Sequence, residues 1–252
     1  MKSKFLFLAA ALLCSAGAMA ADDARPAKVK IILVGDSTVN DRTGWGTGFK
    51  QLLTDKAECI NTAANGRSSK SFMAEGRWTN ALALKGDYYL IQFGHNDEPG
   101  KGPERETQPE TTYRENMTRY VDETRAIGAK PVLVTSLVRR SWNKNGDGKI
   151  TSSLVPYVEV VKKIAAEKNV PLIDLHASSK ELCEQLGVEK CNELSARVKG
   201  TNAVETVDNT HLNAEGSTVF AKLVVTGLAQ SVPELAPCLK TAEAGEPKAA
   251  GK

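Results

Sequence analysis

Short, continuous runs of apolar residues alternate along this chain with longer segments whose apolar residues recur at helical spacing. The runs predict β-strands at residues 28–34, 58–62, 87–93, 130–138 and 170–174. The other segments predict helices at residues 48–56, 110–127, 154–168 and 214–228, and another around Leu182. Because the strands are apolar on both sides, we expect a parallel sheet buried between two layers of helices. The pattern predicts one doubly wound α/β domain without an internal repeat.

Both ends of the chain depart from this pattern. A basic start precedes an apolar run at residues 5–13 and an Ala-Met-Ala triplet that ends at Ala20, which is typical of a signal peptide spanning residues 1–20. The run is too short to cross a bilayer, so no membrane insertion is expected after cleavage. We therefore expect export, to a periplasm or out of the cell, of a folded domain at residues 21–239. Residues 240–252 lack apolar periodicity and are expected to form a disordered tail.

The charge of the chain bears on its binding partners, and its cysteine content bears on disulfides and metal ligands. The formal net charge of +3 falls to +1 without the two lysines of the signal peptide, so nucleic-acid and membrane partners are not indicated. Four cysteines remain after cleavage, and an even number in an exported chain favours disulfides over metal ligation. Cys183 and Cys191 flank Gly187 and are the expected pair. Cys59 and Cys238 are left as a second pair or as buried thiols.

Polar residues follow three of the predicted strands. Ser37 follows the first strand, Gly66 the second and Asn96 the third. Carboxyl ends of parallel strands meet at one edge of a sheet, where ligands bind, so these residues can converge. Asp208 and His211 stand three residues apart before the last helix, in a segment that can fold over the same edge. Serine needs a base to take its proton and an acid to orient that base, so the set predicts a Ser-His-Asp hydrolase.

Each segment also has a structural interpretation when it is taken singly. Ser37 can cap a helix, Asp208 and His211 can be ordinary loop residues, and Asn96 can stabilise a turn. In the functional interpretation, the amide of Asn96 and the backbone N–H groups of Gly66 and Ser37 donate to an oxyanion. The order of the segments, and their position at strand ends, favour the functional interpretation.

The four segments resemble the sequence blocks of the SGNH hydrolases. They read Gly-Asp-Ser-Thr-Val at 35–39, Asn-Gly-Arg-Ser-Ser-Lys-Ser-Phe at 65–72, Gln-Phe-Gly-His-Asn-Asp at 92–97 and Asp-Asn-Thr-His-Leu at 208–212. Within that superfamily, the Gly-Arg-Ser and Ser-Phe segments and the histidine before asparagine most resemble those of the rhamnogalacturonan acetylesterases. The resemblance extends over about residues 30–230.

The resemblance implies a flavodoxin-like, three-layer α/β/α sandwich with a parallel five-stranded sheet. It implies that Ser37 is the nucleophile, that His211 is the base oriented by Asp208, and that no metal or organic cofactor is needed. Gly66 and Asn96 would then be oxyanion donors beside the N–H of Ser37.

Further residues are candidates for contact with the substrate or with a metal. Trp45 could stack on a sugar ring or close the core, Arg67 could meet an acidic polysaccharide, and His95 could line the site. His176 has no acid at triad spacing and is expected to be a packed or surface histidine. Residues 143–150 match half of a calcium loop but lack its closing Glu, so a tight turn and no metal site is expected there.

The expected function is that of an exported serine esterase. It would remove acetyl groups from a plant cell-wall polysaccharide, with rhamnogalacturonan of pectin favoured by the resemblance. The same residues could serve acetylated xylan, another acetyl glycan or a lipid ester. A non-catalytic carbohydrate-binding or envelope protein that retains the fold is the alternative of another class. The sequence gives no indication of an oligomeric state.

Overall fold

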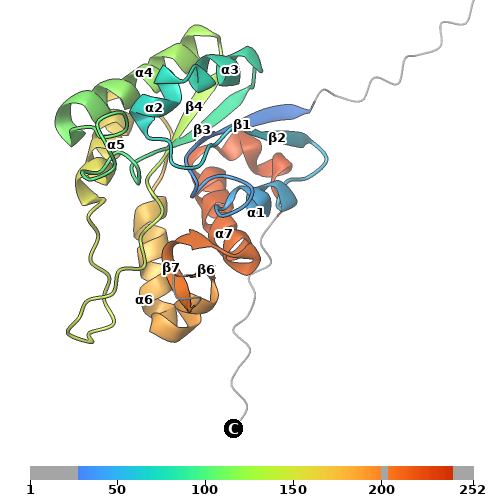
Figure 1. The fold of residues 1–252 in the computed structure, drawn as a ribbon. Helices are drawn as coiled ribbons and strands as arrows, with labels where there is room; N and C mark the ends of the chain where they lie inside the picture. Colours follow the sequence, from blue (N-terminus) through green and yellow to red (C-terminus); the bar gives the residue numbers. More distant parts are fainter. Residues whose placement is uncertain (1–27, 200–203, 241–252) are drawn as a thin grey trace, which may run out of the picture.

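The protein is a three-layer α/β/α sandwich around one parallel sheet (Figure 1). A computed structural model describes residues 28–199 and 204–240, so the expected signal peptide and residues 241–252 lie outside the described residues. The five strands are β1 (Val29–Gly35), β2 (Ala57–Asn61), β3 (Tyr88–Gln92), β4 (Lys130–Val134) and β5 (Leu172–Ile173). They pair in parallel in the order β2-β1-β3-β4-β5. The predicted fold class is confirmed.

Alternate residues of the central strands enter two separate cores, as the two-residue period of a strand requires. On β1, Ile31 and Leu33 face one core, while Ile32 and Val34 face the other. The first core is closed by α1 (Gly46–Gln51), α6 (Leu175–Glu193) and α7 (Ala214–Ser231). The second is closed by α2 (Ser69–Ala74), α3 (Arg77–Ala83), α4 (Arg114–Ala126) and α5 (Val155–Lys168). Burial on both faces explains why the strands are continuously apolar.

Short elements complete the described chain. A π-helical turn (Pro109–Tyr113) precedes α4, and a 3-10 helix (Pro233–Cys238) follows α7. Two strands, β6 (Ser195–Lys199) and β7 (Glu205–Leu212), form an antiparallel pair outside the main sheet. The sequence pattern predicted a loop at β7 and no element at α2 or α3. No helix in the described part of the chain is long and apolar enough to cross a membrane.

The predicted disulfide between Cys183 and Cys191 is not formed. Both are fully buried free thiols, and Cys59 and Cys238 are free as well. Helix α6 bends at Gly187, whose φ of 77° is left-handed, so the two cysteines come together inside the bend. A hydrogen bond between the two thiols, together with burial, raises the pKa of Cys183. The pair therefore packs in the core as small apolar side chains.

Candidate active site

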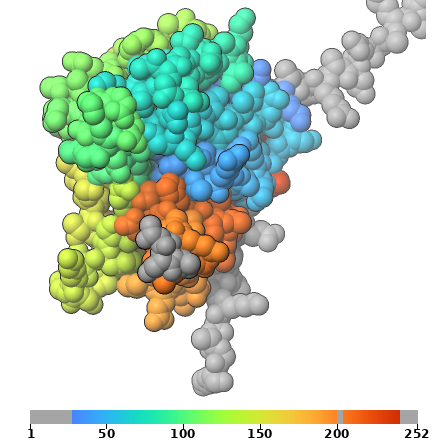
Figure 2. Space-filling model, in the orientation of Figure 1, coloured from blue at the N-terminus to red at the C-terminus, as the bar shows by residue number. Residues whose placement is uncertain are grey.

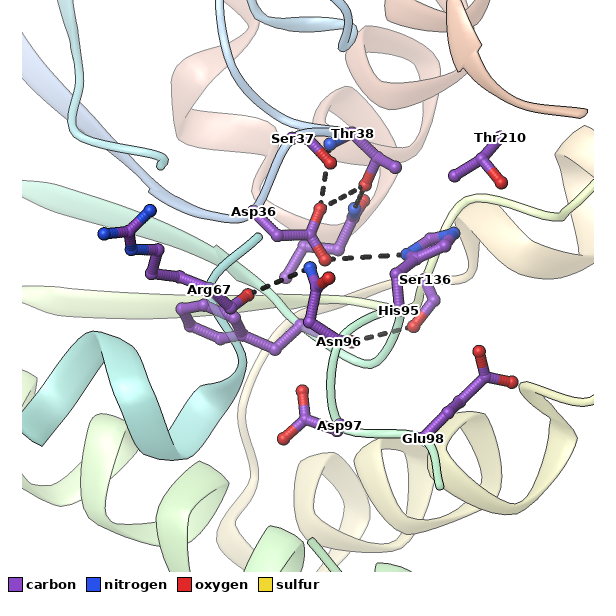
Figure 3. A network of polar contacts seen from close by, with 12 residues as sticks. Asp36, Ser37, Thr38, Arg67, His95, Asn96, Asp97, Glu98, Ser136 and Thr210 are labelled. Carbon is purple, nitrogen blue, oxygen red and sulfur yellow. Dashed lines mark hydrogen bonds and ion pairs between the residues drawn. The ribbon is translucent and has the colours of Figure 1, made fainter. Parts of the chain in front are cut away.

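Ser37 lies directly beyond the carboxyl end of β1, in the loop that leads to α1. A cross-strand chain of hydrogen bonds fixes this loop (Figure 3): Asp36 Oδ1 accepts from the backbone N–H and the hydroxyl of Thr38 at 2.8 and 2.7 Å. The Thr38 hydroxyl accepts in turn from the amide of Gln92 on β3 at 2.7 Å. Since α1 begins only at Gly46, Ser37 does not cap a helix, and the capping interpretation is wrong.

Ser37, His211 and Asp208 form a continuous hydrogen-bonded line. His211 Nε2 lies 2.8 Å from Ser37 Oγ, and His211 Nδ1 lies 2.7 Å from Asp208 Oδ2. Because Nδ1 faces a carboxylate, the proton of a neutral imidazole belongs on Nδ1, which leaves Nε2 free to accept from the serine hydroxyl. The three residues therefore have the geometry of a nucleophile, a base and an orienting acid.

The carboxylate of Asp208 is held in its ionised form. Burial alone would raise the pKa of Asp208, but the hydrogen bonds from the imidazole of His211 and from the backbone outweigh it and lower the pKa. The backbone bonds come from the N–H groups of Thr210 and His211, at 2.8 and 3.0 Å from Oδ1. An ionised acid is what stabilises an imidazolium that forms beside it.

The pair Asp208 and His211 reaches the sheet edge on β7. On the surface, the orange C-terminal segment borders the blue N-terminal segment, although they are far apart in sequence (Figure 2). The backbone N–H of Leu212 donates to the carbonyl of Thr43 at 2.8 Å, which fastens the end of β7 to the loop that follows Ser37.

Arg140 is a positioning residue that the sequence pattern did not identify. Its side chain is 3% exposed, and its guanidinium donates to the carbonyl oxygens of Asp208, Thr210 and His211 at 3.1, 3.3 and 2.7 Å. It also donates to the Ser195 hydroxyl of β6 at 2.9 Å. Burial lowers the pKa of Arg140 from its ordinary value. An arginine after a strand gives no signal of such a role in the sequence.

Gly66 and Asn96 lie near Ser37 on the two neighbouring loops. Gly66 has a φ of 73°, a left-handed conformation that favours glycine and turns the loop after β2. The Asn96 amide donates to the carbonyl of Arg67 at 3.2 Å, so it faces the Gly66 loop (Figure 3). Its second N–H has no acceptor within the described residues. Backbone and amide N–H groups from two loops can therefore converge on one oxyanion.

Asp97, next to Asn96, connects two segments beside the site, which the sequence pattern did not indicate. Its buried carboxylate accepts from the N–H and the hydroxyl of Ser69, at 3.1 and 2.6 Å, and from the hydroxyl of Thr107 at 3.0 Å. Burial raises the pKa of Asp97 to about 7 despite these donors. Asp97 therefore ties the loop after β3 to the start of α2, which follows the Gly66 loop.

His95 lies beneath the site and does not line it. The side chain is 3% exposed, and Nδ1 lies 3.6 Å from Asp36 Oδ2 (Figure 3). Neither ring nitrogen has a hydrogen-bond partner within the described part of the chain. Burial would raise the pKa of Asp36, but His95 and Thr38 together lower it below its ordinary value. The candidate substrate contact is thus corrected to a buried neighbour of Asp36.

Two other residues that were candidates for contact with the substrate form hydrogen bonds within the protein instead. Trp45 is 0% exposed and its indole N–H donates to Gln92 at 3.0 Å, so it closes the core and cannot stack on a sugar. Arg67 Nε lies 3.0 Å from the Glu75 carboxylate, and its Nη1 donates to the Asn65 carbonyl at 2.8 Å. The guanidinium of Arg67 therefore braces the Gly66 loop.

His176 and the calcium-like segment have the structural roles expected of them. His176 is buried, its Nδ1 lies 2.9 Å from the Ser136 carbonyl, and burial lowers its pKa. The Asp147 carboxylate accepts from the side chains of Asn143 and Asn145 and from the Lys149 N–H, which makes a tight turn. Over residues 28–199 and 204–240, no group of three or more His, Cys, Asp or Glu side chains could hold a metal ion.

Two cavities differ in their relation to Ser37. A cavity of about 800 Å³ is bounded by Lys28, Asp87 and Lys130, at the amino ends of the strands and so at the opposite edge of the sheet. A cavity of about 280 Å³ lies at the carboxyl edge, between the loops that carry Ser37 and Gly66. Ligands of such sheets bind at the carboxyl edge, and the smaller cavity lies at this edge, as Ser37 does.

Comparison with known proteins places this site in a family context. A family model described as GDSL-like Lipase/Acylhydrolase family matches residues 33–219. The rhamnogalacturonan acetylesterase RhgT of Bacillus subtilis (strain 168) is 38% identical over 216 residues, which cover 79% of this chain and 89% of that protein. The probable rhamnogalacturonan acetylesterase YesY of the same organism is 35% identical over 206 residues, covering 79% and 91%.

Solved structures share the fold at lower identity. The protein YXIM of Bacillus subtilis has a TM-score of 0.65 and 23% identity, and the match covers 81% of this chain but only 57% of that one. A variant of Axe2, an acetyl xylan esterase from Geobacillus stearothermophilus, has a TM-score of 0.60 and 20% identity, covering 79% and 94%. At these identities the likeness concerns the fold alone.

Proposed function

The chain belongs to the GDSL-like lipase/acylhydrolase family, and from this premise we propose that it is a serine acetylesterase of acetylated rhamnogalacturonan, a plant cell-wall polysaccharide. The observation that carries the catalytic proposal is the line of hydrogen bonds from Ser37 Oγ through His211 to Asp208, at 2.8 and 2.7 Å. The names of the relatives at 38% and 35% identity support the substrate.

In the first half of the reaction, Ser37 Oγ attacks the carbonyl carbon of the acetyl group while His211 Nε2 takes the hydroxyl proton. The imidazolium that results is stabilised by the ionised Asp208. The carbonyl oxygen becomes an oxyanion, which accepts from the N–H groups of Ser37 and Gly66 and from the free N–H of the Asn96 amide. The bond to the sugar oxygen then breaks, and His211 returns the proton to that oxygen.

In the second half, water attacks the acetyl-serine. His211 Nε2 takes a proton from the water, and the same donors stabilise the second oxyanion. When the bond to Ser37 Oγ breaks, the proton passes from His211 to the serine and acetate leaves. Every proton transfer runs through one nitrogen, so the reaction needs no second base.

The nature of the neighbouring cavity favours a sugar over a lipid. It is lined by Asn40, Asp41, Arg42, Asn61, Ala63 and Asn65, of which all but one are polar. A lipid ester would call for an apolar lining. Acetylated xylan is the closest competing substrate, because it presents the same acetyl ester on a neutral sugar. A non-catalytic carbohydrate-binding role would leave the hydrogen bond between Ser37 and His211 without a purpose.

Export is part of the proposal. The basic start, the apolar run and the Ala-Met-Ala triplet at residues 18–20 support cleavage after residue 20, with the mature chain in a periplasm or outside the cell. Determination of the N-terminal sequence of the protein from a cell envelope or culture fluid tests it. A mature chain that retains Met1 would contradict cleavage.

Acetate release from a panel of polysaccharides tests the substrate. We expect the wild-type protein to release acetate from acetylated rhamnogalacturonan faster than from acetylated xylan or glucomannan, and Ser37→Ala to release almost none. A preference for acetylated xylan would indicate that the substrate is a neutral glycan. Equal acetate release by the wild type and Ser37→Ala would reject the serine mechanism itself.

A further inference from the structure

We propose that the polar cavity between the Ser37 and Gly66 loops is a subsite for the carboxylate of an acidic sugar, with Arg42 as its charged ligand. The proposal rests on the proposed function and deepens it: the chain would distinguish a uronate-containing polysaccharide from a neutral one. The cavity measures about 280 Å³ and is lined by Asn40, Asp41, Arg42, Asn61, Ala63 and Asn65.

The cavity is continuous with the catalytic loops. Asn40 belongs to the turn that follows Ser37, where its backbone N–H donates to the Asp36 carbonyl at 3.2 Å. The Thr43 hydroxyl, one residue beyond Arg42, donates to the carbonyl of Ser37 at 2.9 Å. On the other wall, Asn65 directly precedes Gly66. A sugar in this cavity would therefore contact the two loops that carry Ser37 and Gly66.

The hydrogen-bond acceptors of the lining are already occupied. Asn40 Oδ1 accepts from the backbone N–H groups of Arg42 and Thr43 at 2.9 and 2.8 Å. Asn61 Oδ1 accepts from the Ala63 N–H at 3.0 Å. The Asn65 amide oxygen accepts from the side chain of Asn40. The three amide oxygens thus accept hydrogen bonds from the protein itself.

The one carboxylate of the lining is occupied as well. Asp41 Oδ1 accepts from the Asn61 amide at 2.7 Å, and Asp41 Oδ2 lies 2.5 Å from Lys50 Nζ. The ion pair with Lys50 offsets part of the charge of Asp41. The acceptors of the lining thus already take part in hydrogen bonds of the protein itself, whereas a ligand that accepts hydrogen bonds can use the donors of the lining.

The donors of the lining are free. Within the described residues, the guanidinium of Arg42 and the Nδ2 group of Asn65 have no hydrogen bond, and Arg42 has no ion pair. Arg42 is exposed and stands at the rim. A guanidinium binds a carboxylate through two parallel hydrogen bonds, and an amide N–H beside it can complete the set.

The other arginines near Gly66 differ from Arg42 in this respect. Arg67 is paired with Glu75 at 3.0 Å, and Arg105 with Glu104 at 3.1 Å. Arg105 Nη1 also comes within 3.9 Å of the point where a Cβ on Gly66 would lie. Both of these guanidinium groups are thus paired with a carboxylate, and within the described residues Arg42 is the one among the three without a carboxylate partner.

Binding measurements test the subsite apart from catalysis. A deacetylated oligosaccharide of alternating galacturonate and rhamnose, and the same oligosaccharide methyl-esterified at its uronates, are titrated calorimetrically into the wild-type protein and Arg42→Gln. Arg119→Gln is the matched control, because it removes the same charge from an exposed side chain on α4. The methyl ester keeps the sugar but lacks the anion.

We expect the wild type and Arg119→Gln to bind the free uronate about tenfold tighter than the methyl ester, and Arg42→Gln to bind both forms alike. A wild type that does not prefer the uronate, or an Arg42→Gln protein that keeps the preference, overturns the subsite. Acetate release from acetylated rhamnogalacturonan separates the two proposals. Deacetylation without uronate preference rejects the subsite alone, whereas uronate binding without acetate release rejects the proposed substrate alone.

Discussion

The carboxylate of Asp97 accepts hydrogen bonds from both the backbone N–H and the hydroxyl of Ser69, at 3.1 and 2.6 Å. These bonds connect the loop that carries Asn96 to the helix that follows the Gly66 loop. Two of the proposed oxyanion donors, Gly66 and Asn96, lie in loops after β2 and β3, so the pairing of the strands alone does not fix the separation of the two residues. Asp97 supplies that connection from a fully buried position.

Asp97→Asn should remove a pH-dependent part of the folding stability. Burial raises the pKa of Asp97 from 3.8 to about 7 in the folded protein. The folded state therefore binds more protons than the unfolded state between these values, and the stability of the wild type falls as the pH rises through this window. Asparagine cannot titrate, so the stability advantage of the wild type should be largest near pH 4 and decrease toward pH 8.

Denaturant unfolding of both proteins at several pH values measures this difference, in which the contributions of all other groups cancel. A difference in unfolding free energy that stays constant from pH 4 to pH 8 would show that Asp97 does not titrate in this range.

Ser37→Ala and His211→Ala should each lower kcat by several powers of ten, because nucleophile and base act as one unit. His176→Ala is the comparison, since its Nδ1 bonds the Ser136 carbonyl and no carboxylate orients it toward Ser37. We expect its turnover to be close to that of the wild type below its unfolding temperature. If folded His176→Ala lost as much turnover as His211→Ala, the assignment of His211 as the base would be wrong.

Asn96→Ala should lower kcat by about a hundredfold or more and leave KM nearly unchanged. In the proposed mechanism the free N–H of this amide donates to the oxyanion, which exists in the transition state and not in the bound ester, so the loss should fall on the rate constant. Steady-state kinetics with a soluble acetyl ester measure both constants, and thermal unfolding shows whether the variant is folded. If Asn96→Ala were folded and less stable but had normal turnover, Asn96 would stabilise a turn and would not act as an oxyanion donor.

Arg140→Lys should lower kcat at least tenfold and lower the unfolding temperature. Lysine keeps the charge but carries three N–H donors on one nitrogen, so it cannot reach the four oxygen atoms that the guanidinium bonds. Buried carbonyl groups left without a donor cost about 1–3 kcal/mol each. Arg119→Lys, on the exposed surface of α4, is the control and should behave as the wild type. Wild-type kinetics in Arg140→Lys would restrict Arg140 to a stabilising role.

The sequence predicted what depends on local pattern. The central strands are continuously apolar because both of their faces are buried, and the strand ends place Ser37, Gly66 and Asn96 at one edge. Strand β7 escaped prediction because its residues are mostly polar and it is held by Arg140, which lies 68 residues before Asp208. A local pattern also could not predict the environment of Trp45, because its indole N–H donates to Gln92 on β3, 47 residues away.

Asp208 and His211 share one strand and are three residues apart, while the bond from His211 to Ser37 joins positions 174 residues apart. The line of hydrogen bonds from Ser37 to Asp208 thus contains one bond between distant parts of the sequence. Asp208 and His211 lie within one short segment, and the long-range contacts that hold β7, from Arg140 and to Thr43, set the distance of His211 from Ser37. A displacement of β7 would separate His211 from Ser37, while the imidazole would keep its hydrogen bond to Asp208 and its tautomer. The position of β7 should therefore affect activity through the distance from His211 to Ser37, which substitutions at the contacts of β7 can vary without altering the pair of Asp208 and His211.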